Sequence, residues 1–342
     1  MKTYLLLADG NSPHTLKWAK ALQPYFKLSI ISLNGISSKL ETLIGKEDCY
    51  ILNTQQKQAG QNYKLIMKLL AIRTIIKKLQ PDIINAHFLS SYGLLAALSH
   101  KKAPKAKVIM SAWGSDVLVT PFRNKLNYKL LKYTLQEADI VTSDALTMSN
   151  VIKSIAPQSD ISTFAFGLET IETYSGEKED LIFSNRTLVT NSNISQILQW
   201  FAKQPTNYRL VIANDGDQRE ALTIETEKLS ITDRVHFVGF ISSQEQEEYY
   251  KKGRYYLSIP SSDATSVSLL EAMQYGMIAI VSDIPANREW IEDGTNGLFF
   301  DPNSQVDSLK VAQDFATINQ DILRKKAHFP SSIKTLVDKV NS

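Results

Sequence analysis

Short apolar runs alternate with longer amphipathic stretches along the chain, and this pattern predicts buried strands separated by helices. In the first half, a helix is expected over 12–23, with Ser12 as its cap and Pro13 at its first position. Strands and helices in alternation indicate right-handed βαβ units and a parallel sheet. The strands expected in this half are 4–8, 28–33, 82–86, 107–111 and 140–143.

A second series of the same kind begins after residue 176 and predicts a second sheet. The chain therefore reads as an α/β protein with two Rossmann-like parallel-sheet domains, at 1–166 and 167–342. The last helix, at about 318–340, is a candidate to pack back on the N-terminal domain. We interpret 166–169 and the polar stretch 175–178 as the connection between the domains. The strands expected in this half are 181–184, 209–213, 235–237, 255–259, 278–281 and 297–300.

Length and composition fit two globular domains. The 342 residues exceed what one hydrophobic core usually organises, and 43% of them are apolar. Cys49 is the only cysteine, which excludes an internal disulfide and a Cys-based zinc cluster and fits a reducing compartment. The first apolar run is too short for a signal peptide, and no run approaches the ~20 apolar residues of a membrane span. We therefore expect a cytoplasmic protein.

The net charge of +3 hides an asymmetry between the two halves. Residues 1–166 hold 21 basic and 10 acidic side chains, whereas the remaining residues hold 17 and 25. Basic side chains on helices rich in Leu, Ile and Tyr suit an anionic membrane surface, although an ordinary solvated helix face would look the same. No nucleic-acid partner is expected, because no binding motif accompanies the charge. The basic groups are Lys64, Lys68, Arg73, Lys77 and Lys78; Lys101, Lys102, Lys105 and Lys107; and Arg123, Lys125, Lys129 and Lys132.

The strongest candidate site follows the strand expected at 255–259, since ligands of parallel sheets bind beyond the carboxyl ends of strands. Small and polar residues form a turn up to Ser266, which can cap a helix starting at Val267, and the amides of such a helix start suit a diphosphate. Asp263 lies before the helix and Glu271 more than one turn inside it. The two carboxylates can therefore hold hydroxyls on either side of bound phosphates. For Glu271, an exposed surface glutamate is the alternative. The 14 glycines show neither the dinucleotide nor the P-loop spacing.

This segment resembles the signature of the retaining family 4 glycosyltransferases, which is Glu-x7-Glu followed by a Gly, a strand, Ser-Asp and a downstream Glu. The resemblance covers nearly the whole chain and implies the GT-B fold, in which two Rossmann-like domains face a central cleft. It implies that the first acid contacts donor-sugar hydroxyls and that the second holds the ribose. In this chain the signature reads Asp263-x7-Glu271, Gly276, 278–281, Ser282-Asp283 and Glu289, with the first acid shortened to Asp.

Further donor-site residues follow from the same resemblance. The amides of Thr265, Ser266 and Val267 would face the diphosphate. Arg186 matches the arginine that neutralises the donor diphosphate. The lysine usually found a few residues later is absent, since 189–194 holds no basic residue.

The resemblance also implies roles for residues outside this segment. Gly239, in the loop that resembles the base-contacting loop of the family, and Asn11, after the first strand, are donor-binding candidates. His87 follows the strand at 82–86, where a family histidine approaches the reacting sugar, although a lone histidine at a strand end is otherwise more often structural. His14 and Trp113 are acceptor-binding candidates; Trp113 stands where the family has a histidine, and it could stack on a sugar or simply pack.

The resemblance implies a retaining glycosyltransferase that moves a sugar from a nucleotide-diphosphate donor to a saccharide or lipid-linked saccharide, in surface polysaccharide or lipopolysaccharide assembly. His87, Asp263 and Arg186 would carry catalysis. Arg186 and the amides near Ser266 would stabilise the departing diphosphate, so neither a metal ion nor a cofactor besides the nucleotide sugar is expected. The basic first half agrees with peripheral binding at the inner face of the cell membrane. Two alternatives stay open: a sugar-nucleotide 2-epimerase on the same scaffold, and a degenerate, non-catalytic binding protein.

Overall fold

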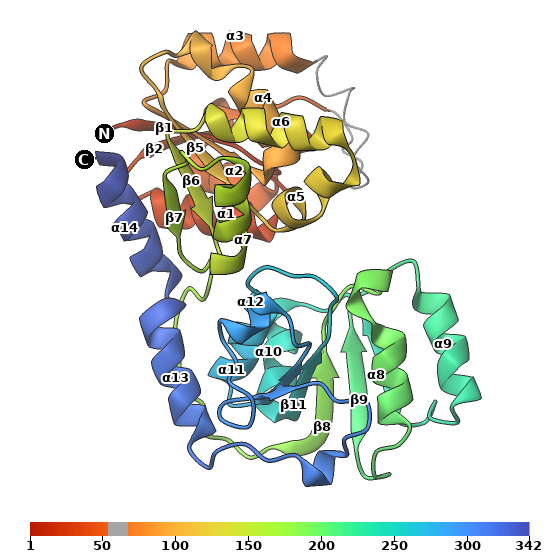
Figure 1. Ribbon diagram of the computed structural model, residues 1–342. Coiled ribbons are helices and arrows are strands. Elements are labelled where there is room, and N and C mark those ends of the chain that lie inside the picture. Colours follow the sequence, from red (N-terminus) through yellow and green to blue (C-terminus); the bar gives the residue numbers. More distant parts are fainter. Residues whose placement is uncertain (54–67, 342) are drawn as a thin grey trace. The chain divides into compact units, whose positions relative to one another are not determined.

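The computed structural model describes residues 1–53 and 68–341, so Lys64 of the first basic group lies outside the described residues. The chain divides into two compact units, Met1–Ala165 together with Phe329–Ser342, and Phe166–His328 (Figure 1). Each unit contains one parallel sheet flanked by helices, which confirms the predicted α/β class with two Rossmann-like domains. Within the described ranges, no helix has the length and apolarity that a membrane span requires.

Seven parallel strands form the sheet of the first unit, in the order β3-β2-β1-β4-β5-β6-β7. Five of them match the predicted runs to within one residue. The other two, β3 and β7, lie at the edges of the sheet, and each is only three residues long with no buried position, so no apolar run marks them. The strands are β1 (Thr3–Leu7), β2 (Lys27–Ser32), β3 (Cys49–Ile51), β4 (Ile83–His87), β5 (Lys107–Ser111), β6 (Ile140–Ser143) and β7 (Ile161–Thr163).

Helices cover both faces of this sheet. Because the strand order runs outward from β1 in both directions, right-handed crossovers place α1 and α2 on one face and α4 and α6 on the other (Figure 1). Ser12 stands at the N-cap of α1 and Pro13 opens the helix, as expected, although the Ser12 side chain accepts no hydrogen bond from a helix amide. The helices are α1 (Pro13–Leu22), α2 (Ser38–Ile44), α3 (Leu69–Leu79), α4 (Leu94–Ala97), α5 (Ser115–Leu118), α6 (Lys125–Gln136), α7 (Leu146–Ile155) and α14 (Phe329–Asn341).

Six parallel strands form the sheet of the second unit, in the order β10-β9-β8-β11-β12-β13. All six predicted runs fall on these strands. The strands are β8 (Glu179–Ser184), β9 (Arg209–Ala213), β10 (Val235–Gly239), β11 (Gly253–Ser258), β12 (Ile278–Val281) and β13 (Leu298–Phe299). The helices are α8 (Ile194–Phe201), α9 (Arg219–Lys228), α10 (Ser243–Lys252), α11 (Val267–Gln274), α12 (Pro285–Arg288) and α13 (Phe315–Lys326).

The C-terminal segment is divided between the units. The structure has two helices where one was expected at about 318–340: α13 in the second unit and α14 in the first. On α14, Phe329 is buried and packs edge-on against Trp18 of α1, with 5.6 Å between the ring centroids. Near its other end, the Lys339 ammonium donates to the Asp160 carboxylate at 2.6 Å. The helix that ends the described chain is therefore part of the first unit's packing.

The predicted connection at 175–178 is wrong, because these residues belong to the second unit. The Lys178 ammonium donates to the carbonyls of Tyr250 and Lys251 at 2.9 Å and to that of Tyr275 at 2.7 Å. These carbonyls end α10 and α11, so one lysine ties the C-termini of two helices together. The chain instead passes between the units after Ala165 and after His328.

Candidate functional site

The loop between β11 and α11 has the predicted form. Ser266 stands at the helix N-cap, and its hydroxyl accepts a hydrogen bond from the amide of Leu269 at 3.3 Å, as expected for a capping serine. Thr265 and Ser266 are buried, and Val267 is half-buried. The start of α11 therefore lies at the carboxyl edge of the second sheet, where its first amides and the positive end of the helix dipole favour an anion.

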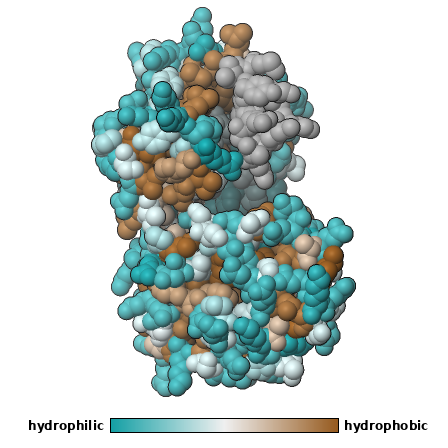
Figure 2. Space-filling model, turned by 45° about the vertical axis from the view of Figure 1, so that its right-hand side comes forward, coloured by the Kyte–Doolittle hydropathy of each residue, from teal (hydrophilic) through white to brown (hydrophobic). Residues whose placement is uncertain are grey.

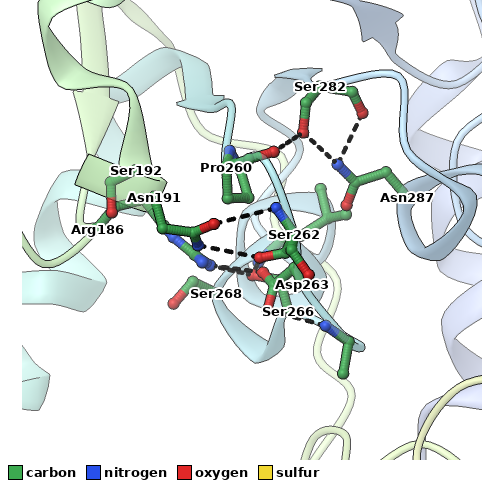
Figure 3. Close-up of polar contacts among 12 residues, drawn as sticks. Arg186, Asn191, Ser192, Pro260, Ser262, Asp263, Ser266, Ser268, Ser282 and Asn287 are labelled. Carbon is green, nitrogen blue, oxygen red and sulfur yellow. Dashed lines mark hydrogen bonds and ion pairs between the residues drawn. The ribbon is translucent and has the colours of Figure 1, made fainter. Parts of the chain in front are cut away.

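Arg186 and Asp263 lie together at this helix start. Arg186 Nη1 donates to Asp263 Oδ2 at 2.8 Å and lies 3.5 Å from Ser266 Oγ (Figure 3). The two side chains are 19% and 22% exposed, so the ion pair is partly screened from water but open to a ligand. The structure thus brings together three residues predicted from the sequence, and it shows that the two catalytic candidates of this unit are partners of each other.

Asparagines hold the loop that carries Asp263. The Asn191 side chain donates to the carbonyl of Ser262 at 3.0 Å and accepts from its amide at 3.1 Å (Figure 3). Asn193 donates to the Ile259 carbonyl at 2.8 Å. These asparagines occupy the stretch 189–194, where the resemblance led us to look for a lysine. Sequence reasoning missed them because they contribute backbone anchoring and no charge.

Glu271 is held by α10. Its Oε2 atom accepts from Gln246 Nε2 at 3.1 Å and from the Tyr250 hydroxyl at 2.9 Å. Burial and the neighbouring Glu271 charge raise the pKa of Tyr250 well above its ordinary value, so this hydroxyl stays a donor. Glu271 is half-buried, so the alternative of an exposed surface glutamate is wrong.

Asn185 joins this carboxylate to the ends of the neighbouring strands. The side-chain amide of Asn185 donates to the Tyr250 hydroxyl at 2.9 Å. The backbone carbonyl of Asn185 accepts from the Asn214 side chain at 2.7 Å. The backbone N–H of Asn214 in turn donates to the backbone carbonyl of Gly239 at 2.7 Å. Gly239 has a φ of +70° and no heavy atom within 4 Å of the place where a Cβ would stand, so its surroundings are open to a ligand. No pattern in the sequence singles out Asn185, which is buried.

The first unit gathers aromatic rings near its candidates. Trp113 lies between two histidines, with ring centroids 5.1 Å from His14 and 5.3 Å from His87. Trp18 packs edge-on against His87 at 4.9 Å. The structure thus brings His14, His87 and Trp113 together. Asn11 is exposed, and its side chain lies against Gly35.

His87 is buried and uncharged. Burial, with a smaller effect from His14, lowers the pKa of His87 to about 3. The Asn85 amide nitrogen donates to the Ile109 carbonyl at 3.2 Å and to Ser111 Oγ at 2.8 Å, which turns the Asn85 oxygen toward His87 Nε2 at 3.1 Å. Nε2 must therefore carry the proton, and Nδ1, which has no hydrogen-bond partner among the described residues, is left as an acceptor.

Asp116 joins the two loops that carry His87 and Trp113. Its carboxylate is buried and accepts from the amide of Leu89 at 2.7 Å and from that of Trp113 at 3.0 Å. Burial raises the pKa of Asp116 to about 6, although these amide hydrogen bonds act in the opposite direction. The backbone beside it is unusual, because Phe88 has a φ of +68° and begins a π-helical turn over Phe88–Gly93, a feature often found at functional sites.

Two family models match the chain, one on each side of residue 150. The model "Glycosyl transferase 4-like" matches residues 4–145, and "Glycosyl transferases group 1" matches residues 170–328. Both models describe glycosyltransferases, and the chain is a glycosyltransferase. The aromatic cluster of this glycosyltransferase falls within the first matched range, and the Arg186–Asp263 pair with Glu271 falls within the second.

Similar proteins agree with this assignment. A stretch of 128 residues is 30% identical to alpha-monoglucosyldiacylglycerol synthase of Streptococcus pneumoniae, a match covering 36% of this chain and 29% of that relative. The glycosyltransferase thus matches less than a third of that relative's length. Anabaena HepE in complex with UDP has a TM-score of 0.70 at 15% identity, covering 99% of this chain and 95% of that one. The pneumococcal O-GlcNAc transferase GtfA in complex with UDP and GlcNAc has a TM-score of 0.75 at 12% identity, covering 99% of both chains. These likenesses show the GT-B fold.

Proposed function

We propose that this glycosyltransferase uses a nucleotide-diphosphate sugar and transfers the hexose, with retention of configuration, to a saccharide or a lipid-linked saccharide. The observation that carries the proposal is the Arg186–Asp263 pair at the capped start of α11. A cation beside free helix amides is an arrangement that stabilises a departing diphosphate. The proposed setting is surface polysaccharide or lipopolysaccharide assembly on the cytoplasmic side of the membrane.

In the proposed mechanism, the leaving diphosphate receives the charge of Arg186 and the amides near Thr265, Ser266 and Val267, without a required metal ion. Asp263 keeps Arg186 in place and approaches the donor-sugar hydroxyls, while Glu271 holds the ribose. No side chain in the candidate regions stands out as a covalent nucleophile, so we propose attack by the acceptor hydroxyl on the face from which the diphosphate departs.

His87 would contribute a hydrogen bond and no charge. A histidine that stays neutral at physiological pH suits a sugar hydroxyl, which would reach the buried Nδ1 acceptor when the rings around it move apart. His14 and Trp113 would border the acceptor, and the rings beside them suit the apolar face of a sugar. For the nucleotide, UDP is the first candidate to test, because the HepE and GtfA structures were solved with UDP.

The proposal is tested by incubating the protein with a panel of sugar nucleotides and following release of the nucleoside diphosphate. A transferase releases it slowly by hydrolysis without acceptor, and faster when a saccharide or lipid-linked acceptor is added. Interconversion of two sugar nucleotides would instead establish an epimerase. A chain that binds no member of the panel and releases no diphosphate would contradict the proposal and favour a degenerate binding protein.

A further inference from the structure

Large apolar side chains are exposed where η5 (Thr120–Arg123) meets α6. Phe122 is 62% exposed, Leu126 is 65% exposed, and Val119 just before them is 36% exposed. Phe122 lies in η5 and Leu126 in the first turn of α6, on the two sides of Asn124, whose extended backbone separates the two helices. Apolar side chains also reach the surface among polar ones elsewhere on the molecule (Figure 2). Those at η5 and α6 stand apart because of the charges around them.

Four exposed basic side chains accompany these apolar ones. Between Val117 and Gln136 the chain has no acidic residue, and among the described residues none of the four forms an ion pair. Three of them repeat at spacings of four and three residues along α6, so they lie along one side of that helix. Their aliphatic stems can extend over apolar surface while the charged ends reach toward anions. The four are Arg123, Lys125, Lys129 and Lys132.

The opposite side of α6 packs against the rest of the first unit. Leu131, Thr134 and Leu135 are buried, and the helix packs against α4 and the π-helical turn that follows His87. The apolar and basic side chains named above are therefore not needed to hold α6 in place. We call Val119, Phe122 and Leu126 with the four basic residues the η5–α6 surface.

We propose that the η5–α6 surface docks on an anionic lipid membrane. Apolar side chains that enter the headgroup region, flanked by unpaired cations that attract anionic lipids, are the two features that interfacial binding requires. A nucleic acid would need the charges but not Phe122 and Leu126, and a protein partner would not require four cations without an acid among them. Charge complementarity thus favours the membrane.

The position of this surface suits the proposed function, on which the inference rests. The chain leaves β5 at Ser111, passes Trp113 and enters α5, which contacts η5, and α6 contacts the π-helical turn that follows β4, so the surface lies beside the loops at the carboxyl edge of the first sheet. A membrane bound there would bring lipid headgroups toward the same unit that holds His14, His87 and Trp113.

Vesicle flotation tests the proposal. At low salt the protein should float with phosphatidylcholine vesicles that contain about a third phosphatidylglycerol, and should stay behind with pure phosphatidylcholine or in 0.5 M salt, where charges are screened. Phe122→Ser with Leu126→Ser, and separately Lys125→Gln with Lys129→Gln, should each weaken binding about tenfold or more. Leu146→Ser is the matched control, because Leu146 is 61% exposed in the same unit but lies outside the surface.

Two results would overturn the proposal. One is vesicle binding that all three variants share equally with the unchanged protein, or no binding to anionic vesicles at all. The other is a dimer in sedimentation that Phe122→Ser with Leu126→Ser dissolves, which would make the surface a contact between copies of this chain. UDP binding, measured on the same proteins, separates this inference from the proposed function: an unchanged protein that binds UDP but does not float with anionic vesicles contradicts the membrane surface alone.

Discussion

The Arg186–Asp263 region of the second unit and the His87–Trp113 region of the first both lie at carboxyl ends of parallel strands, yet their surroundings are opposite. Arg186 and Asp263 are partly exposed charges that neutralise each other at 2.8 Å. His87 is buried among rings, and its pKa of about 3 keeps it uncharged. In the proposed function, the second unit would meet an anion with a charged pair, whereas the first would offer uncharged hydrogen-bonding groups and aromatic rings. Substitutions in the two regions should therefore fail in different ways.

Replacement of the cation should have the largest effect. Arg186→Ala removes the side chain that would face the developing diphosphate charge, so kcat should fall roughly 10²–10³-fold. Nucleoside diphosphate release at saturating donor measures it. Arg209→Ala is the control, because Arg209 forms an exposed pair with Glu179. An Arg186→Ala protein that keeps more than a tenth of the original kcat would show that the second unit does not act through this charge.

Asp263 allows a test of charge against length. Asp263→Asn keeps the shape but loses the ion pair with Arg186, and kcat/KM should fall about 10–100-fold. Asp263→Glu keeps the charge and restores the length that the family signature has, so it should stay well above Asp263→Asn. Rates on several sugar donors should also shift for Asp263→Glu. Equal activity of the two variants would mean that the carboxylate charge is not what holds the site.

His87 should affect transfer without affecting nucleotide affinity. His87→Gln removes the Nδ1 acceptor, and kcat/KM should fall about tenfold, the cost of one hydrogen bond. Asn85→Leu frees His87 Nε2 from its partner and should give a similar loss. Because both act through one ring, the double variant should be little worse than either single one. UDP affinity should not change; a matching loss of UDP affinity would contradict the separation of roles.

The smallest effect expected is on stability against pH. The folded-state pKa of His87, about 3, lies below its ordinary 6.5, so the unfolded chain gains a proton first and stability falls as pH drops below 6.5, by up to about 2 kcal/mol at pH 5. Asp116, with its pKa raised to about 6, acts in the opposite direction as pH falls through 6. His87→Gln should therefore lose less stability than the unchanged protein between pH 7 and pH 5 in urea unfolding. Equal losses would show that His87 titrates normally.

Most strands and helices of the fold could be predicted from the sequence. Apolar runs marked every central strand, since parallel strands are buried on both faces. The edge strands β3 and β7 were not predicted, because each consists of three half-exposed or exposed residues and forms no apolar run. The break between α13 and α14 was missed although Pro330, the second residue of α14, lies inside the predicted helix and is a residue that interrupts helices.

The candidate residues were also identified in sequence, but their partners were not. Arg186 and Ser266 were expected near a diphosphate and Asp263 near the donor sugar, yet the ion pair depends on how the loop after β8 meets the loop after β11. Asn85, Asn185 and Asn191 act by orienting other groups. An asparagine in a sequence gives no sign of which backbone or ring it will hold, because that is decided by tertiary contacts.

The central claim is that the second unit binds the nucleoside diphosphate, and calorimetric titration with UDP tests it most directly. The unchanged protein should bind UDP, and Glu271→Ala should bind it about 10–100-fold more weakly, because a ribose hydroxyl loses a charged acceptor. Glu271→Gln, which keeps the contacts to α10, should also bind more weakly, and Glu220→Ala, an exposed glutamate of α9, should not differ from the unchanged protein. UDP affinity within twofold of the unchanged protein in both Glu271 variants would contradict the account.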